Sequence, residues 1–235
     1  MKDLSSMKFF NPTNDAANQD IENINAQHIA CVLLLDRSGS MAGQKIQELN
    51  EGMRNFKKSF EEMAEQDRGA IDIAVISFGG DVRLDQDFRP SSAFTPTSYT
   101  ADGGTPLGQA LDMALQKIAE RKDLYRQNST PYYRSWVFCI TDGMPTEDCT
   151  AAAKRLKDLE ASKGVLGYCV GVDGYDLGNM QGIFDPDRCF TLAGTDFAGL
   201  FEFVSNSLAA ARNSNGSQQL SVTAPATLHQ ITMTV

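Results

Sequence analysis

The chain has 235 residues, 42% of them hydrophobic, and a formal net charge of -9. This length and composition can fill the core of one larger domain, or of one domain with extensions. Because the chain is acidic and has no clustered basic face, we expect neither nucleic acid nor a membrane surface among its partners.

Hydrophobic runs alternate along the chain with patterns typical of amphipathic helices. Six runs predict β-strands, at residues 28–35, 71–78, 82–88, 136–141, 166–172 and 189–192. Apolar residues spaced three or four apart predict helices at residues 44–65, 106–125, 150–162 and 196–211. Strands separated by helical crossovers form a parallel sheet covered on both faces. We therefore expect an α/β fold with a doubly wound, mostly parallel six-stranded sheet and helices on both faces.

One connection is too short to hold a helix. Gly79 and Gly80 separate the second run from the third and favour a hairpin, which makes the third strand an antiparallel edge. Right-handed crossovers then give the strand order 3-2-1-4-5-6, in which strands one and four are neighbours at the topological switch point. Because ligands of such sheets bind beyond the carboxyl ends of these strands, a binding site is expected there.

The two ends of the chain differ in composition from the middle. We expect a polar N-terminal arm at residues 1–27, a folded domain at 28–211, and a polar linker with a strand-like tail at 212–235. The arm lacks the layout of a signal peptide, and the apolar run 29–35 is far shorter than the roughly 20 residues of a membrane-spanning helix. A cytoplasmic protein is expected.

The five cysteines include no C-x-x-C pair. Cys31, Cys139 and Cys169 lie within strand-like runs. An odd number of cysteines in such positions favours buried, reduced thiols over disulfides or a zinc site.

Side chains that carry oxygen follow the two central strands. Asp36 ends the first run and begins the stretch DRSGS, which also contains Ser38 and Ser40. Asp142 follows the fourth run, and Thr105 stands in GGTPL just before a predicted helix. Since strands one and four are neighbours, Asp36 and Asp142 are expected to lie close together, where two carboxylates share either a proton or a cation. The glycines before Thr105 let its loop approach the same point.

These five residues offer oxygen ligands only. Such a set suits a hard cation, Mg²⁺ in the first place with Mn²⁺ or Ca²⁺ as alternatives, rather than zinc or copper. With these pieces in this order and spacing, the sequence resembles the von Willebrand factor type A (VWA) domains that carry a metal-ion-dependent adhesion site. The resemblance covers about residues 28–211 and includes all five ligand positions, Asp36, Ser38, Ser40, Thr105 and Asp142.

The resemblance implies a Rossmann-like VWA fold and a role for each ligand. Ser38 and Ser40 would bind the metal directly, whereas Asp36, Thr105 and Asp142 would bind it directly or through water. An aspartate or glutamate of a partner protein would complete the metal's coordination, so the family implies a protein-binding module and not an enzyme.

Two stretches, LLLDRSGSM and GGTPLGQAL, look most like the bacterial cytoplasmic VWA group associated with tellurium-resistance gene clusters. The resemblance therefore implies a place in a bacterial stress or tellurium-resistance complex. Members of that group can carry a cysteine-rich zinc module at the C-terminus. No cysteine follows Cys189 here, so the resemblance does not extend to that module.

The sequence also allows purely structural roles for three of these residues. Ser40 and Thr105 both stand just before helical segments, where N-caps occur. Asp142 precedes Gly143 and suits an ordinary turn.

An enzyme is the alternative class of function. An aspartate at the end of a first parallel strand, with Mg²⁺, is also the nucleophile of aspartyl-phosphate phosphotransferases, and Asp36 fits that position. Haloacid-dehalogenase-like phosphatases place a second aspartate two residues later, where this chain has Ser38. A serine hydrolase is disfavoured because the only histidines are His28, at a strand start, and His229, in the tail.

Further acidic residues follow the strands that end near the expected site. If they form a negative rim, they attract cations and favour a partner whose metal-binding carboxylate lies within a basic surface. These residues are Asp81, Asp85, Asp87, Asp102, Glu147 and Asp148, of which Asp85 and Asp87 run away along the edge strand and are expected to contribute little.

Overall fold

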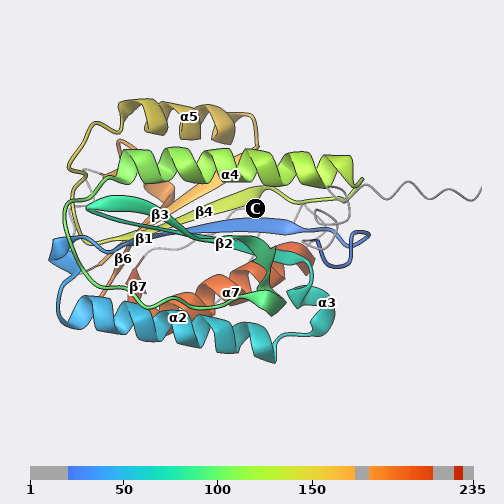
Figure 1. Ribbon diagram of the computed structural model, residues 1–235, viewed down its shortest axis with the longest axis horizontal. Coiled ribbons are helices and arrows are strands. Elements are labelled where there is room, and N and C mark those ends of the chain that lie inside the picture. The colour runs from blue at the N-terminus through green and yellow to red at the C-terminus, as the bar shows by residue number, and fades with distance from the viewer. Residues whose placement is uncertain (1–20, 173–179, 214–224, 230–235) are drawn as a thin grey trace, which may run out of the picture.

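The structure is a computed structural model that describes residues 21–172, 180–213 and 225–229. Its centre is a seven-stranded sheet in the order β3-β2-β1-β4-β5-β6-β7 (Figure 1). The strands are β1 Ile29–Asp36, β2 Ile71–Gly79, β3 Asp81–Pro90, β4 Ser135–Thr141, β5 Val165–Gly171, β6 Cys189–Leu192 and β7 Leu228–His229. The helices are α2 Gln44–Glu62, α3 Glu65–Arg68, α4 Leu107–Gln127, α5 Thr150–Ala161 and α7 Phe197–Asn213, with short 3-10 turns at Gly39–Met41, Ser91–Ala93 and Pro186–Arg188.

The predicted fold class and strand order are confirmed. Strands β2, β1, β4, β5 and β6 pair in parallel, and β3 returns antiparallel to β2 through the hairpin at Gly80. The predicted number of strands is wrong, because β7 pairs antiparallel with β6 and forms a second antiparallel edge. β7 lies within the strand-like tail predicted at 212–235, but its two residues are too few to predict that it joins the sheet beside β6. The sheet therefore has the switch point between β1 and β4, as expected.

The first long helix ends earlier than predicted. The apolar stripe continues to Met63, but Met63 has an extended backbone and its amide N donates to the carbonyl O of Phe60. The chain then restarts as the single turn α3. The helix predicted at 44–65 thus ends at Glu62, and Glu65 already begins α3.

Side chains of the buried strands alternate between two cores because successive residues of a strand point to opposite faces. In β1, Cys31, Leu33 and Leu35 belong to the core under α2 and α7. Val32 and Leu34 belong to the core under α4 and α5. Figure 1 shows α4 and α5 above the sheet and α2 and α7 below it. The continuous apolar runs in the sequence reflect this burial on both faces.

All five cysteines lie within the described residues and are buried and free, as predicted for Cys31, Cys139 and Cys169. From the predicted N-terminal arm, Ile21 is already buried in the core under α4. The rest of the arm before residue 21, and most of the tail predicted at 212–235, lie outside the described residues. Among the helices that are described, none combines the length and apolar character needed to span a membrane.

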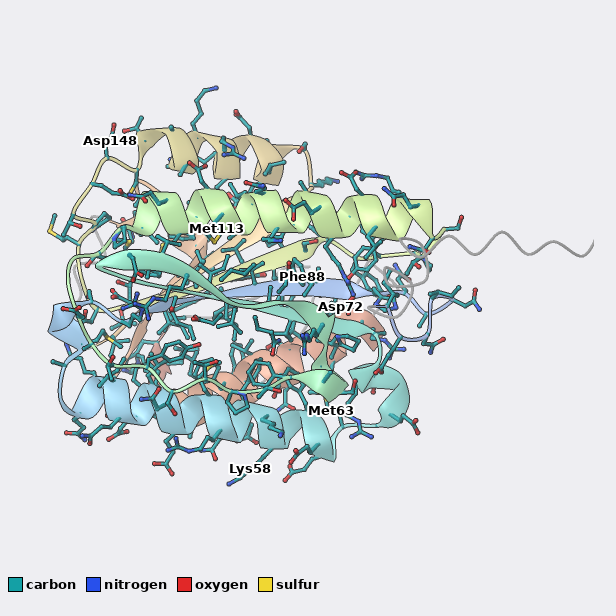
Figure 2. All side chains as sticks on the ribbon, viewed as in Figure 1. Lys58, Met63, Asp72, Phe88, Met113 and Asp148 are labelled. Atoms are coloured by element: carbon teal, nitrogen blue, oxygen red, sulfur yellow. The ribbon has the colours of Figure 1, made fainter. Side chains whose placement is uncertain are left out.

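A network of buried polar groups occupies the amino end of the sheet, opposite the predicted site. Asp72 on β2 accepts from the Tyr125 hydroxyl, lies 2.8 Å from Nδ1 of His28 and pairs with the Arg121 guanidinium at 2.9 Å. All four side chains are almost fully buried. Figure 2 shows Asp72 and Phe88 near the sheet, between α4 and the α2 layer, whereas Lys58 lies on the outer side of α2. The network ties β1, β2 and α4 together.

Candidate metal site

Asp36 is the last residue of β1, and its side chain is held at both oxygens. Oδ1 accepts from the backbone N of Ser38 at 2.7 Å, and Oδ2 accepts from Oγ1 of Thr141 at 2.5 Å. Because Thr141 ends the neighbouring strand β4, the two central strands jointly fix the carboxylate. Thr141 was not among the residues predicted from the sequence, and its position one residue before Asp142 was the available signal.

The two serines and Asp142 form a chain of oxygen atoms next to Asp36. Ser38 Oγ and Ser40 Oγ lie 3.0 Å apart, and Ser40 Oγ donates to Oδ1 of Asp142 at 2.6 Å. Ser38 and Asp142 are buried, while Ser40 is exposed at the rim. The structure therefore brings the DRSGS loop and the loop after β4 together, as the strand order predicts.

Thr105 faces the same place from a third loop. A Cβ atom added to Gly143 would lie 3.5 Å from Ser40 Oγ and 3.7 Å from Thr105 Oγ1, so both hydroxyls border the point that Gly143 leaves open. Thr105 N donates to Thr146 Oγ1 at 3.0 Å, and Thr146 N donates to the Thr105 carbonyl O at 3.1 Å. These two bonds fix the Thr105 loop against the loop of Asp142.

Glycines allow the three loops to approach this closely. Gly39 N donates to the Gly103 carbonyl O at 2.9 Å, and Gly80 N donates to the Gly104 carbonyl O at 3.0 Å. Gly103 has a φ of 67°, and a Cβ atom on it would lie 2.6 Å from the backbone N of Gly80. A side chain at Gly103 would therefore separate the loops.

The simpler roles that the sequence left open do not match the geometry. The N-cap of α2 is Gly43 and that of α4 is Pro106, so neither Ser40 nor Thr105 caps a long helix. Asp142 bonds across to Ser40, 102 residues away in the chain, rather than within its own turn. The three polar side chains therefore point into the site.

A lysine that was not predicted from the sequence also reaches the site. Lys45 Nζ, from the first turn of α2, lies 2.6 Å from Oδ2 of Asp142. Within the described residues Asp36 has no comparable ion pair. Burial raises the pKa of the Asp36 carboxyl, and the charge of Asp142 raises it further, whereas hydrogen bonds from Ser38 and Thr141 lower it. A buried carboxylate of this kind is stabilised by a nearby cation.

Two of the acidic residues predicted to rim the site, Asp81 and Asp87, lie in ion pairs. Asp81 pairs with Arg37 and with Arg83, and Asp87 pairs with Lys117. Glu147 accepts from the backbone N of Gln109, near the start of α4. A negative rim around the site therefore stays a prediction, with the charges of Asp81 and Asp87 offset by their cationic partners.

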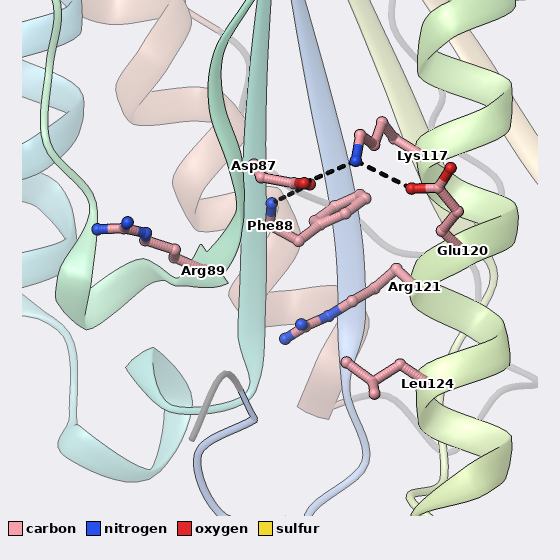
Figure 3. Close-up of a pocket in the computed structure, with 7 residues that line it drawn as sticks. All are labelled: Asp87, Phe88, Arg89, Lys117, Glu120, Arg121 and Leu124. Atoms are coloured by element: carbon pink, nitrogen blue, oxygen red, sulfur yellow. Dashed lines mark hydrogen bonds and ion pairs between the residues drawn. The ribbon is translucent and has the colours of Figure 1, made fainter. Parts of the chain in front are cut away.

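A hollow of about 320 Å³ lies elsewhere, between the edge strand β3 and α4 (Figure 3). Figure 3 shows Lys117 between Asp87 and Glu120, and its Nζ donates to these carboxylates at 2.6 and 2.9 Å. Lys117 thus engages both carboxylates that line this hollow. In the part of the chain that the structure describes, no three His, Cys, Asp or Glu side chains gather as a metal site.

The candidate site is of another kind, since it combines two carboxylates with three hydroxyl groups. Such oxygen donors fit a hard divalent cation and offer nothing that favours a soft one. The residues that would hold it are Asp36, Ser38, Ser40, Thr105 and Asp142.

Comparison with known proteins agrees with this architecture. A family model of the von Willebrand factor type A domain matches residues 31–206. A search of curated proteins found no match.

Solved structures with the same fold come from distant proteins. Proximal thread matrix protein 1 from the mussel byssus is 17% identical, with a TM-score of 0.54 over 82% of this chain and 48% of that protein. A von Willebrand factor type A protein from Catenulispora acidiphila is 16% identical, with a TM-score of 0.56 over 80% of this chain and 43% of that protein. The corresponding domain of the type V pili tip protein Mfa5 from Porphyromonas gingivalis is 13% identical, with a TM-score of 0.57 over 84% and 99% of the two chains.

This chain spans less than half the length of the first two proteins, and at these identities the likeness concerns the fold alone. One structure of the mussel protein, 17% identical and with a TM-score of 0.54 over 80% of this chain and 46% of that one, has a zinc-occupied MIDAS motif, the metal-ion-dependent adhesion site.

Proposed function

The chain belongs to the von Willebrand factor type A domain family, and from this premise we propose that it is a metal-dependent protein-binding module. A divalent cation, Mg²⁺ in the first place, would be held by Asp36, Ser38, Ser40, Thr105 and Asp142. The partner would be a protein that presents an aspartate or glutamate to the cation. The sequence resemblance alone supports a bacterial cytoplasmic complex of the tellurium-resistance type.

The observation that carries the proposal is the convergence of three loops on one point. Ser40 Oγ lies 3.0 Å from Ser38 Oγ and 2.6 Å from Asp142 Oδ1, and Thr105 borders the same open point beside Gly143. Ser38 and Ser40 would offer neutral hydroxyl oxygens and Asp36 and Asp142 would offer charge. A bound cation supplies a coordination position that a carboxylate of another protein can take.

The same geometry disfavours the alternative, Mg²⁺-dependent phosphotransfer by Asp36. A nucleophilic carboxylate needs an oxygen that can reach a substrate. Asp36 is fully buried, and each of its oxygens already accepts a hydrogen bond, from Ser38 N and from Thr141 Oγ1. Turnover of generic phosphate esters that Asp36→Asn abolishes would overturn the binding proposal.

Millimolar Mg²⁺ or Mn²⁺ is expected to raise the melting temperature, because the assembled site exists only in the folded chain. At a cation concentration about 100 times the dissociation constant the stabilisation is about 2.7 kcal/mol, roughly 5–10 °C for a domain of this size. Ser38→Ala should remove most of the shift. Ser59→Ala is the matched control, since Ser59 Oγ donates to the Asn55 carbonyl within α2. A shift of equal size in all three proteins would contradict the assignment.

Partner binding is the direct test of the function. The full chain is immobilised and incubated with a cell lysate in Mg²⁺, in EDTA, and as the Ser38→Ala variant. We expect specific partners to be retained in Mg²⁺ and lost under the other two conditions. Added acetate at tens of millimolar should compete with a partner's carboxylate and weaken the capture. If the same proteins are captured in Mg²⁺, in EDTA and with the Ser38→Ala variant, the result counts against a metal-dependent module.

A further inference from the structure

We propose that Lys45 is a built-in competitor of the divalent cation, which neutralises Asp142 while the metal is absent and must leave when it binds. This inference rests on the proposed metal site and adds a residue that tunes its affinity. Lys45 Nζ lies 2.6 Å from Asp142 Oδ2, whereas Ser40 Oγ donates to Asp142 Oδ1. Both oxygens of Asp142 are thus engaged, one by the turn before α2 and one by its first turn.

The two donors to Asp142 differ in whether they tolerate a metal ion. The Ser40 hydroxyl can donate its proton to Asp142 and still turn a lone pair toward a cation, because a hydroxyl has one donor and two acceptor sites. The Lys45 ammonium has three donors and no acceptor, so it cannot be a ligand. Its positive charge repels a divalent ion that binds beside the same carboxylate.

The position of Lys45 in α2 is a second observation that supports the proposal. The N-terminus of a helix carries a partial positive charge, which disfavours a cationic side chain in the first turn. The first turn of α2 has no acidic residue to offset Lys45. Contact with Asp142 is therefore a favourable interaction for this lysine, and that contact is lost when a metal takes the carboxylate.

Lys45 can leave the site without disturbing the core. Its side chain is 25% exposed, while the Asp142 side chain is fully buried. A lysine stem on a surface helix has the freedom to move its head group into water. Asp142 therefore exchanges one cation for another. The measured free energy of metal binding is then the interaction of Asp142 with the metal minus the interaction with Lys45 that is lost.

The test is calorimetric titration of Mg²⁺, and in parallel Mn²⁺, into the metal-free full chain. Lys45→Met keeps the stem and removes the charge, so we expect a dissociation constant about tenfold lower than that of the wild type. Lys45→Arg keeps the charge and should stay near the wild-type value. The matched control is Lys57→Met, on the same helix, whose side chain is 44% exposed and pairs with Glu61. Lys57 lies about 18 Å further along α2, beyond the roughly 8 Å Debye length of physiological salt.

Melting in EDTA and in saturating Mg²⁺ gives a second readout. In EDTA, Lys45→Met should melt below the wild type because Asp142 loses its charged partner. In Mg²⁺ the two proteins should melt at nearly the same temperature, so the variant shows the larger cation-induced shift.

Each outcome of the titration has a distinct meaning. Tighter binding by Lys45→Met alone supports the proposal, as does binding by that variant when the wild type shows none. Equal or weaker binding by Lys45→Met, with a wild type that binds, overturns the role of Lys45 and leaves the metal site standing. No binding by any of the proteins overturns this inference together with the proposed function.

Discussion

Asp72→Asn is expected to lower the free energy of unfolding by about 3–5 kcal/mol, the usual effect of breaking a buried ion pair from one side. Asp72 is fully buried and contacts Arg121, His28 and Tyr125 at the same time. Burial alone would lower the pKa of Arg121, but Asp72 and Tyr125 raise it overall, so the guanidinium stays charged. Asparagine keeps the shape of the side chain and leaves that charge buried without its counter-ion.

Chemical denaturation of the variants measures this effect. The matched control is Asp87→Asn, which breaks a pair with Lys117 where the Asp87 side chain is 54% exposed. Exposed pairs of this kind contribute about 0–1 kcal/mol. If the two asparagine variants lose the same small amount, the network at the amino end of the sheet does not hold β1, β2 and α4 together.

The fold was predictable because it depends on patterns that are local in the sequence. The apolar runs of β1, β4 and β5 are long enough to identify buried parallel strands, and the Gly79-Gly80 pair marks the hairpin between β2 and β3. The tail that contains β7 was predicted to be strand-like, but its pairing with β6, Thr191 with His229 and Leu192 with Leu228, was not predictable, since two residues are too few to define a partner strand. The end of α2 was misplaced because Met63 keeps the apolar stripe after the backbone has left the helix.

The candidate ligands were predictable from topology, and their surroundings were not. The order of the strands alone places Asp36 and Asp142 at one edge. Lys45 and Thr141 were not predicted because their roles depend on where the end of the side chain lies, not on which strand or helix carries the residue. Asp72 interrupts an apolar strand in the sequence, and its partners come from positions 44 to 53 residues away, which no local pattern joins.

Gly103→Ala is expected to have the other large effect, on stability and on metal binding together. Gly103 has a φ of 67°, and a left-handed backbone costs a non-glycine residue about 1–2 kcal/mol. The added Cβ would also overlap the backbone of Gly80, and relief of such overpacking costs about 1–3 kcal/mol more. The expected loss of unfolding free energy is about 2–5 kcal/mol.

The matched control separates the strain of the backbone from the clash. Gly194 has nearly the same φ, 68°, and a Cβ on it would meet nothing within 4 Å. Gly194→Ala should therefore lose only about 1–2 kcal/mol and leave metal binding unchanged. The excess loss in Gly103→Ala measures the contact between the loops at the carboxyl edge of the sheet.

Metal binding shows whether that contact positions the ligands. To relieve the clash, the loop of Gly103 must move from Gly80 and strain the bond from Gly39 N to the Gly103 carbonyl O. Because Thr105 is only two residues further along, its hydroxyl moves with the loop, whereas Ser38 and Asp36 stay on β1 and its turn. We expect the affinity for Mg²⁺ to fall at least tenfold, measured by calorimetry on the folded variant. Unchanged affinity in a destabilised Gly103→Ala protein would mean that the close approach of these loops supports the fold but does not place Thr105 at the cation.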